Sequence, residues 1–259
     1  MDLNPAFEDS VSFIRREYRL ILPVAFSTLG LSVLLLGAMI PPMAQNGQLP
    51  PGDWMWWLVP TSVLAGIGAL ALSALRLFPG MSVGEAMGCA LRHILPLCLV
   101  MLASMVALII GLTILGILLM VVLTSTPEAA VVQAMVFGLP FSLYIGARLA
   151  LVSSALVSRG PDESAISAVR RALRLVRGHA WRIALIMLAA STVYLFLLFT
   201  LTAVLGSTLL IFGRLIGNPA LGETLLRLLI ALYASSFFAA FSIVMASIYQ
   251  RLSGRTNGI

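Results

Sequence analysis

The sequence predicts an all-α, polytopic membrane protein with six transmembrane helices and additional amphipathic interfacial helices. Of the 259 residues, 60% are hydrophobic and 10% are charged, whereas a soluble domain carries about 25% charged residues. The apolar residues come in runs of about twenty or more, the length at which an α-helix crosses the hydrocarbon core. A membrane β-barrel needs alternating segments of about ten residues, and the sequence has no such pattern. We therefore expect residues 1–259 to form a single membrane domain.

Six apolar runs define the predicted spans, and Pro, Gly or polar residues separate them. Their approximate bounds are 20–40, 54–78, 94–123, 130–157, 183–212 and 225–248. The third and fifth runs are longer than the roughly twenty residues that a bilayer requires, so we expect these helices to tilt, bend or extend past it. Gly111, Gly116 and Gly206 are the predicted bend points.

Arginine supplies all sixteen basic residues, and the formal net charge is +6. The arginines concentrate before the first run, between the second and third, between the fourth and fifth, and after the sixth. Because short cytoplasmic loops are enriched in basic residues, this distribution predicts that both termini are cytoplasmic. It also favours membrane topology, rather than nucleic-acid binding, as the reason for the positive charge.

Residues 159–182 hold six of the sixteen arginines. We expect a helix that begins at Pro161, has Asp162 and Glu163 in its first turn, and stops at Gly178. Its apolar and basic residues recur three and four positions apart on different sides: Ala165, Val169, Ala172, Leu173 and Val176 on one, and Arg170, Arg174 and Arg177 on the other. This pattern predicts an amphipathic helix that lies in the membrane surface with its apolar face toward the lipid.

A similar segment occurs earlier in the chain. Residues 79–92 align without gaps on residues 161–174, with six of fourteen positions identical. Each copy lies between two predicted spans, so we expect a repeat of span, interfacial helix and span over about 54–123 and 130–212. An offset of an even number of spans makes this a parallel repeat. Residues 1–19 are predicted to form a third, cytoplasmic amphipathic helix.

The arginine cluster is the candidate binding site for anionic phosphate groups. Its members are Arg170, Arg171, Arg174, Arg177 and Arg182. Each basic residue near an anionic leaflet contributes about 1 kcal/mol of attraction, and the guanidinium fork matches phosphate oxygens. Membrane topology with general headgroup contact is the simpler explanation of the cluster, and a dedicated lipid or phosphorylated-ligand site is the alternative.

Three further charged residues stand out. Arg148 lies inside the fourth run, about ten residues before its end, where a charge costs at least a few kcal/mol unless it is satisfied. Its side chain either extends along its aliphatic stem to the headgroups, or it lines a polar cavity, binds backbone carbonyls or binds a lipid phosphate. Glu85, on the first amphipathic segment, is expected to form a structural ion pair with Arg92 or with an arginine of the second segment.

Enzyme signatures such as a Walker loop, HExxH, a nucleophile elbow or paired CxxC are missing from the sequence. His93 and His179 each precede a span, without carboxylates or cysteines at ligand spacing, so we expect interfacial anchoring rather than metal binding. Cys89 and Cys98 are expected to be reduced. The sequence thus predicts a non-enzymatic protein without a metal or cofactor.

Small residues recur four positions apart in two spans, where they allow close helix packing. These are Ala65, Ala69 and Ser73 in the second span, and Ala231, Ser235 and Ala239 in the sixth. Packing within the monomer is the first explanation, and self-association or a partner subunit is the second.

The residues after the fourth span also resemble a known motif. Ala168, Arg171, the run RLVRG at 174–178, Trp181 and Arg182 are similar to a motif in bacterial six-span proteins. These are the YciC-like proteins and the membrane domain attached to some glycerophosphodiester phosphodiesterases. Family members usually have Ser near Ala172 and an aromatic residue near Leu173, and the catalytic barrel of the phosphodiesterases is missing here. The resemblance implies a six-span fold in a bacterial inner membrane and no reaction.

From these observations we expect a protein that binds, senses or organises anionic lipid, or that scaffolds other membrane proteins. One alternative is a transporter or channel component in which Arg148 lines a polar path. Another is an accessory subunit of a larger membrane complex, docked through the small-residue faces.

Overall fold

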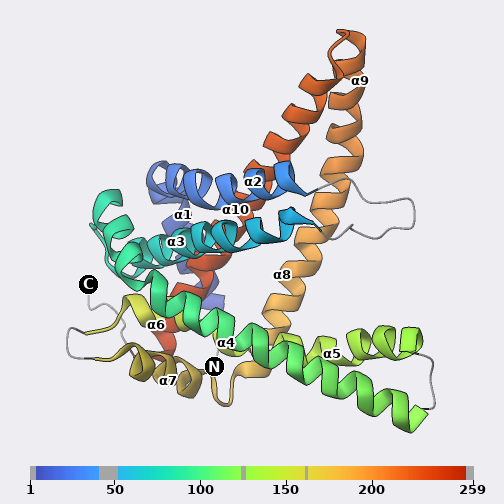
Figure 1. Cartoon of the computed structure of the whole chain (residues 1–259). Helices are drawn as coiled ribbons and strands as arrows, with labels where there is room; N and C mark the ends of the chain where they lie inside the picture. The colour runs from blue at the N-terminus through green and yellow to red at the C-terminus, as the bar shows by residue number, and fades with distance from the viewer. Residues whose placement is uncertain (1–3, 41–51, 124–126, 161–162, 255–259) are drawn as a thin grey trace. The chain divides into compact units, whose positions relative to one another are not determined.

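The computed structural model describes residues 4–40, 52–123, 127–160 and 163–254, and within these ranges the regular structure is entirely helical (Figure 1). The prediction of an all-α protein is confirmed. The elements in chain order are α1 (Asn4–Ala25), η1 (Phe26–Gly30), α2 (Leu31–Met39), η2 (Asp53–Trp57), α3 (Leu58–Leu77), α4 (Val83–Leu123), α5 (Pro127–Leu149), α6 (Val152–Val157), α7 (Ala165–Val176), α8 (Ala180–Leu201), η3 (Thr202–Gly206), α9 (Ser207–Leu215) and α10 (Pro219–Leu252).

Six of the helical stretches are long and apolar enough to cross a membrane, as predicted. They are Pro5–Met39, Asp53–Leu77, Val83–Val121, Gly138–Val157, Ala180–Leu215 and Pro219–Leu252. Each overlaps one of the predicted runs, and three of them extend beyond their run by ten or more residues, because amphipathic or polar flanks continue the helix.

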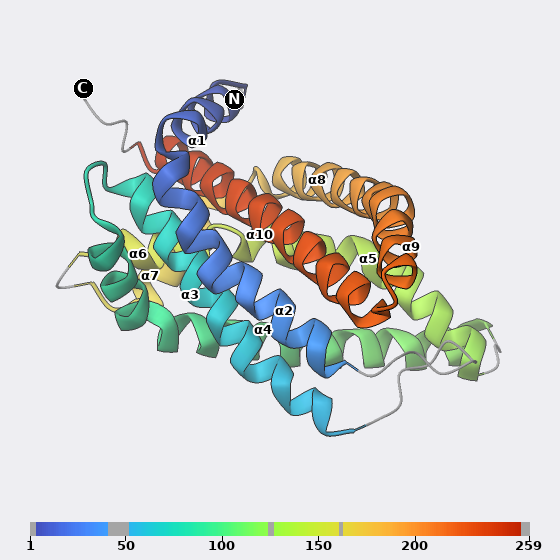
Figure 2. The same cartoon turned by 90° about the horizontal axis from the view of Figure 1, so that it is seen from above.

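The chain divides into two compact units, Met1–Ile94 with Ala190–Ile259, and Leu95–Ala189. The dividing points fall inside α4 and α8, so they coincide with neither of the expected repeat segments. In the first unit, α10 lies alongside α1, α2 and α3 (Figure 2). The small-residue face of α10 (Ala231, Ser235 and Ala239) is buried, which supports packing within the monomer as its role.

Helix α1 bends at Glu17, whose backbone angles (φ −110°, ψ 17°) leave the helical region. The bend lies close to the expected boundary at residue 19 between an amphipathic helix and the first span. The amphipathic part buries Ala6, Ser10 and Phe13, and α1 packs on α10. A π-helical turn, η1, then links α1 to α2, and a second, η3, ends at the predicted bend point Gly206.

Helices α9 and α10 approach each other at backbone distance. A Cβ atom added to Gly222 would lie 2.7 Å from the carbonyl oxygen of Leu209, and one added to Gly213 would lie 2.9 Å from the amide nitrogen of Gly222. Such contacts are shorter than van der Waals separation and involve the main chain. Glycine is therefore required on both sides of this helix crossing.

In the second unit, α7 packs against α6 and α5. Gly146 of α5 leaves room for the Met187 side chain of α8, because a Cβ there would lie 3.3 Å from the methyl carbon of Met187. The short helix α6 is buried except at the half-buried Ser153, and Leu151 at its N-cap is buried as well. Helix α7 thus covers the end of the fourth candidate span.

The expected repeat is not seen. Helix α4 runs from Val83 to Leu123 without interruption, so residues 79–92 form no separate interfacial helix there. By contrast, α7 is separated from α8 by an extended Arg177 and by Gly178 at φ 93°. The difference has a local cause, since only the second segment has a glycine that adopts the left-handed conformation at its end.

Candidate functional site

Helix α7 is shorter at its N-terminus than predicted. It begins at Ala165, and the hydroxyl of its N-cap residue Ser164 accepts a hydrogen bond from the Ser167 amide at 3.2 Å. Glu163 therefore precedes the helix, and the expectation that it lies in the first turn was wrong. Pro161 and Asp162 lie outside the described residues. A serine hydroxyl at the N-cap satisfies one of the backbone N–H groups that have no partner within the first turn of a helix.

One side of α7 is buried in protein. Ala168, Ala172 and Val176, spaced four residues apart, are each 0% exposed, and the helix packs against α6 and α5. The prediction that the apolar side of this helix lies toward lipid was therefore wrong for Ala172 and Val176, which belong to that side. Small side chains at this spacing allow α7 to approach its neighbours closely.

Arg170, Arg174 and Arg177 lie opposite the buried stripe, and all three are exposed. We call these three residues the arginine face. None of the ion pairs described within residues 163–254 involves them. Large apolar side chains lie next to it in sequence, since Ile166 is 70% exposed and Trp181 is 60% exposed. The exposed residues from Ile166 in α7 to Trp181 at the start of α8 thus combine aliphatic and indole groups with guanidinium groups that have no ion-pair partner among the described residues.

Arg171 is turned away from the arginine face and holds α7 in place. Its Nη1 lies 3.1 Å from Oε2 of Glu163, and its Nη2 donates to the carbonyl oxygen of Ala155 and to Oγ of Ser158, both at 3.2 Å. The side chains of Arg171 and Glu163 are 29% and 23% exposed. Because the acceptors belong to the last turn of α6, Arg171 ties α7 to that turn. We call this set of contacts the Arg171 latch.

The other predicted residues are distributed along the second unit. Arg182 is exposed in the first turn of α8, close in sequence to the arginine face. Arg148 lies in the last turn of α5, with its guanidinium carbon 4.8 Å from the ring centroid of Tyr144. The Nε atom of Arg148 is buried and has no hydrogen-bond partner among the described residues.

The expected ion pair between Glu85 and Arg92 is not formed in the described part of α4. Oε2 of Glu85 instead accepts hydrogen bonds from the amide and the hydroxyl of Ser82, both at 2.8 Å, and Ser82 Oγ accepts from the Glu85 amide at 3.3 Å. This is a capping box, whose S-x-x-E signature is visible in the sequence. Two residues seven positions apart on a helix are about 10 Å apart along its axis, too far for an ion pair.

His93 lies within the third candidate span, Val83–Val121, and His179 lies directly before the fifth, Ala180–Leu215. His93 Nδ1 lies 2.8 Å from the carbonyl oxygen of Cys89, one turn earlier in α4, whereas His179 Nδ1 is buried without a hydrogen-bond partner among the residues described. Cys89 and Cys98 are free thiols. No group of three His, Cys, Asp or Glu residues within the described ranges is placed to hold a metal ion.

Sequence reasoning missed a polar cluster in the first unit. Arg76 Nε donates to Ser247 Oγ at 2.8 Å, and Ser10 Oγ donates to the same oxygen at 2.9 Å. One residue before Ser10, Asp9 pairs with Arg251 at 2.6 Å. These contacts join α1, the end of α3 and the end of α10. Their sequence separations are 171 residues or more, so no local pattern could have revealed them.

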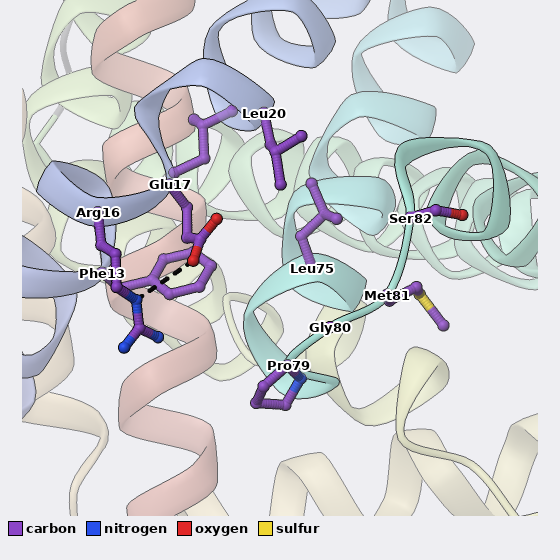
Figure 3. Close-up of a pocket in the computed structure, with 10 residues that line it drawn as sticks. Phe13, Arg16, Glu17, Leu20, Leu75, Pro79, Gly80, Met81 and Ser82 are labelled. Carbon is purple, nitrogen blue, oxygen red and sulfur yellow. Dashed lines mark hydrogen bonds and ion pairs between the residues drawn. The ribbon is translucent and has the colours of Figure 1, made fainter.

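A cavity of about 260 Å³ lies beside this cluster, at the bend of α1 and the turn between α3 and α4 (Figure 3). All of its lining residues belong to the first unit. The residues of the arginine face belong to the second unit.

No family model, curated protein or solved structure matches this chain. The resemblance to the YciC-like proteins stays a prediction based on the motif in and after α7.

Proposed function

We propose that the protein is a non-enzymatic membrane protein that binds anionic lipid headgroups at the cytoplasmic leaflet of a bacterial inner membrane, through the arginine face of α7. The observation that supports this most is that neighbouring arginines of α7 differ in their contacts and exposure. Arg171 is occupied by the latch, whereas Arg170, Arg174 and Arg177 are exposed without a carboxylate partner in the described region. The location follows the arginine distribution and the motif resemblance.

The chemistry of the arginine face fits a phosphate headgroup. A guanidinium group forms paired hydrogen bonds to phosphate oxygens, and each cation near an anionic surface contributes about 1 kcal/mol. Ile166 and Trp181, exposed nearby in sequence, suit the boundary between headgroups and acyl chains, where indole rings concentrate. An exposed surface of this mixed character favours a membrane surface over a soluble anionic ligand.

Lipid binding through the arginine face requires that α7 keeps a fixed orientation, and contacts with α5 and α6 hold it in that orientation. The buried stripe and the Arg171 latch fix α7 on α6 and α5. The arginine face is thereby held in one direction before lipid arrives, so little ordering free energy opposes binding. A fixed surface of this kind serves to bind, sense or organise anionic lipid and to present it to membrane partners.

Lipid binding to a charge-matched pair of variants tests the proposal. Arg170→Gln/Arg174→Gln and Arg214→Gln/Arg227→Gln each remove two exposed arginines. We expect the first double variant to lose about 30-fold in affinity for phosphatidylglycerol, from about 1 kcal/mol for each charge. The second is expected to lose clearly less. Equal losses would mean that only net charge matters, and no loss in the first would reject the arginine face.

One observation favours a second function, the passage or binding of an anion within the membrane. Arg148 lies midway along the candidate span Gly138–Val157, and its buried Nε has no described partner. The helix is interrupted just after it, since α5 ends at Leu149 and α6 begins at Val152. Interrupted helices with polar groups often mark transport sites. Anion flux in proteoliposomes, lost in Arg148→Gln and kept in Arg148→Lys, would support this function; an absence of flux in the wild type would reject it.

A further inference from the structure

The cavity at the bend of α1 is lined by both charged and apolar side chains. In Figure 3, Arg16 and Glu17 lie on one side, and Pro79, Gly80, Met81 and Ser82 lie on the opposite side. The lining also includes Phe13, Ile21 and Leu75, each 6% exposed, and the more exposed Leu20. The cavity is therefore amphipathic, with charge at its rim.

The rim presents one positive and one negative group side by side. Arg16 Nε lies 3.2 Å from Oε1 of Glu17, and the two side chains are 74% and 32% exposed. An exposed ion pair between adjacent residues contributes little to stability. Both groups therefore remain able to bind a ligand, the guanidinium to an anion and the carboxylate to a cation that has N–H donors.

The location of the cavity points to a membrane amphiphile. The bend of α1 at Glu17 lies just before the first predicted run, 20–40, and the Pro79–Gly80 turn follows the candidate span Asp53–Leu77. Both are expected at the cytoplasmic headgroup level. A volume of about 260 Å³ is slightly smaller than a pocket for a drug-sized ligand, about 300–1,000 Å³. It suits a headgroup and the first methylene groups of a chain, while the rest of the lipid stays in the bilayer.

We infer that this cavity binds a zwitterionic phospholipid with a primary ammonium group, such as phosphatidylethanolamine. The phosphate lies on Arg16, the ammonium donates hydrogen bonds to Glu17, and the start of an acyl chain contacts Leu20 and Leu75. An anionic lipid without an ammonium group leaves Glu17 facing like charge. This ligand differs in charge from the one proposed for the arginine face, so neither inference depends on the other.

A choline headgroup fits less well than an ethanolamine headgroup. A trimethylammonium group has no N–H donor for Glu17 and is bound best by open aromatic faces. Phe13 is the aromatic residue of the cavity, and the guanidinium carbon of Arg76 already lies 5.1 Å from its ring centroid. The cavity is thus expected to discriminate between two zwitterionic headgroups that have the same net charge.

Native mass spectrometry of the purified full-length protein tests the inference, with phosphatidylethanolamine, phosphatidylcholine and phosphatidylglycerol of identical acyl chains. The variants are Arg16→Gln, Glu17→Gln and Met81→Trp, which fills the cavity from its wall. Arg15→Gln is the matched control, because Arg15 is the neighbouring arginine and does not line this cavity. Thermal unfolding of each variant checks that it is folded.

We expect the wild type to bind phosphatidylethanolamine preferentially. Arg16→Gln and Glu17→Gln should each weaken that binding about fivefold, from about 1 kcal/mol for an exposed charged contact. Met81→Trp should abolish the preference, and Arg15→Gln should keep it. Equal binding of the three lipids by the wild type would overturn the inference. So would a preference for phosphatidylglycerol that depends on Arg16 but not on Glu17, or an equal loss in Arg15→Gln. If Arg16→Gln does not fold, the headgroup preference of the wild type and the effect of Met81→Trp decide.

Discussion

The contrast between Arg171 and its neighbour Arg170 gives the sharpest test of how α7 is built. Arg171→Gln removes an ion pair to Glu163 and two hydrogen bonds to the end of α6. Arg170→Gln removes the same charge from an exposed position. The structure therefore predicts that the first substitution loosens α7 and that the second leaves its packing unchanged.

The size of the effect follows from the geometry of the Arg171 latch. A hydrogen bond to a charged group contributes about 1.5–3 kcal/mol, and an exposed ion pair contributes about 0–1 kcal/mol. Here the two side chains are about one quarter exposed, and the buried Nε of Arg171 has no hydrogen-bond partner among the described residues, which lowers the net gain. We therefore estimate about 2 kcal/mol for the local opening of α7.

Hydrogen–deuterium exchange measures that opening directly. A loss of about 2 kcal/mol should accelerate exchange of the amides in Ala165–Val176 about 30-fold in Arg171→Gln. Arg170→Gln should exchange like the wild type. Glu163→Gln should reproduce part of the effect, and the double variant with Arg171→Gln should add less than the sum of the two. Unchanged exchange in Arg171→Gln, or equal acceleration in Arg170→Gln, would refute the latch.

Three further predictions concern helix packing and capping, and thermal unfolding in detergent checks each of them. Gly222→Ala should destabilise the protein by about 1–3 kcal/mol, because the new Cβ would meet the Leu209 carbonyl oxygen at 2.7 Å. Gly88→Ala, with no atom within 4 Å of its Cβ, should stabilise it by up to about 1 kcal/mol. A change in stability of the same sign in both variants would contradict the close approach of α9 and α10. Ser247→Ala should lower the stability of the protein by about 1–3 kcal/mol, because it leaves Arg76 and Ser10 without their shared acceptor. Ser242→Ala, which loses only a hydrogen bond within its own helix, should be nearly neutral. Similar losses of stability in the two variants would argue against the polar cluster. Ser82→Ala should lower the stability of the protein by about 1 kcal/mol through loss of the capping box, and Arg92→Gln should leave the stability unchanged. A larger loss in Arg92→Gln than in Ser82→Ala would instead support the ion pair expected from the sequence.

The spans could be predicted because the signal for a transmembrane helix is local. About twenty consecutive apolar residues suffice, whatever they pack against. Helix ends were harder, because competing signals lie close together. At the start of α7, Ser164 is the N-cap rather than a residue inside a helix that starts at Pro161. In α4, by contrast, no left-handed glycine follows Arg92, so the helix continues to Leu123.

The role of each arginine depended on information that the sequence does not hold locally. Arg170 and Arg171 are adjacent, and successive helical residues point about 100° apart. Which of the two faces inward is decided by where α6 lies, and its acceptors Ala155 and Ser158 are 16 and 13 residues away. Arg76 is a stronger case, because its partner Ser247 is 171 residues away. Helical periodicity identified a basic side of α7 but did not show that Arg171 is turned toward the end of α6.

Contact between the arginine face and lipid phosphate is the central claim, and solid-state NMR measures it most directly. Protein with ¹⁵N-labelled guanidinium groups is placed in phosphatidylglycerol bilayers, and its dephasing by phospholipid ³¹P is recorded. We expect short-range dephasing in the wild type, reduced in Arg170→Gln/Arg174→Gln/Arg177→Gln and kept in Arg171→Gln, because Arg171 is held by Glu163 and α6. Equal dephasing in the wild type and the triple variant would contradict the claim.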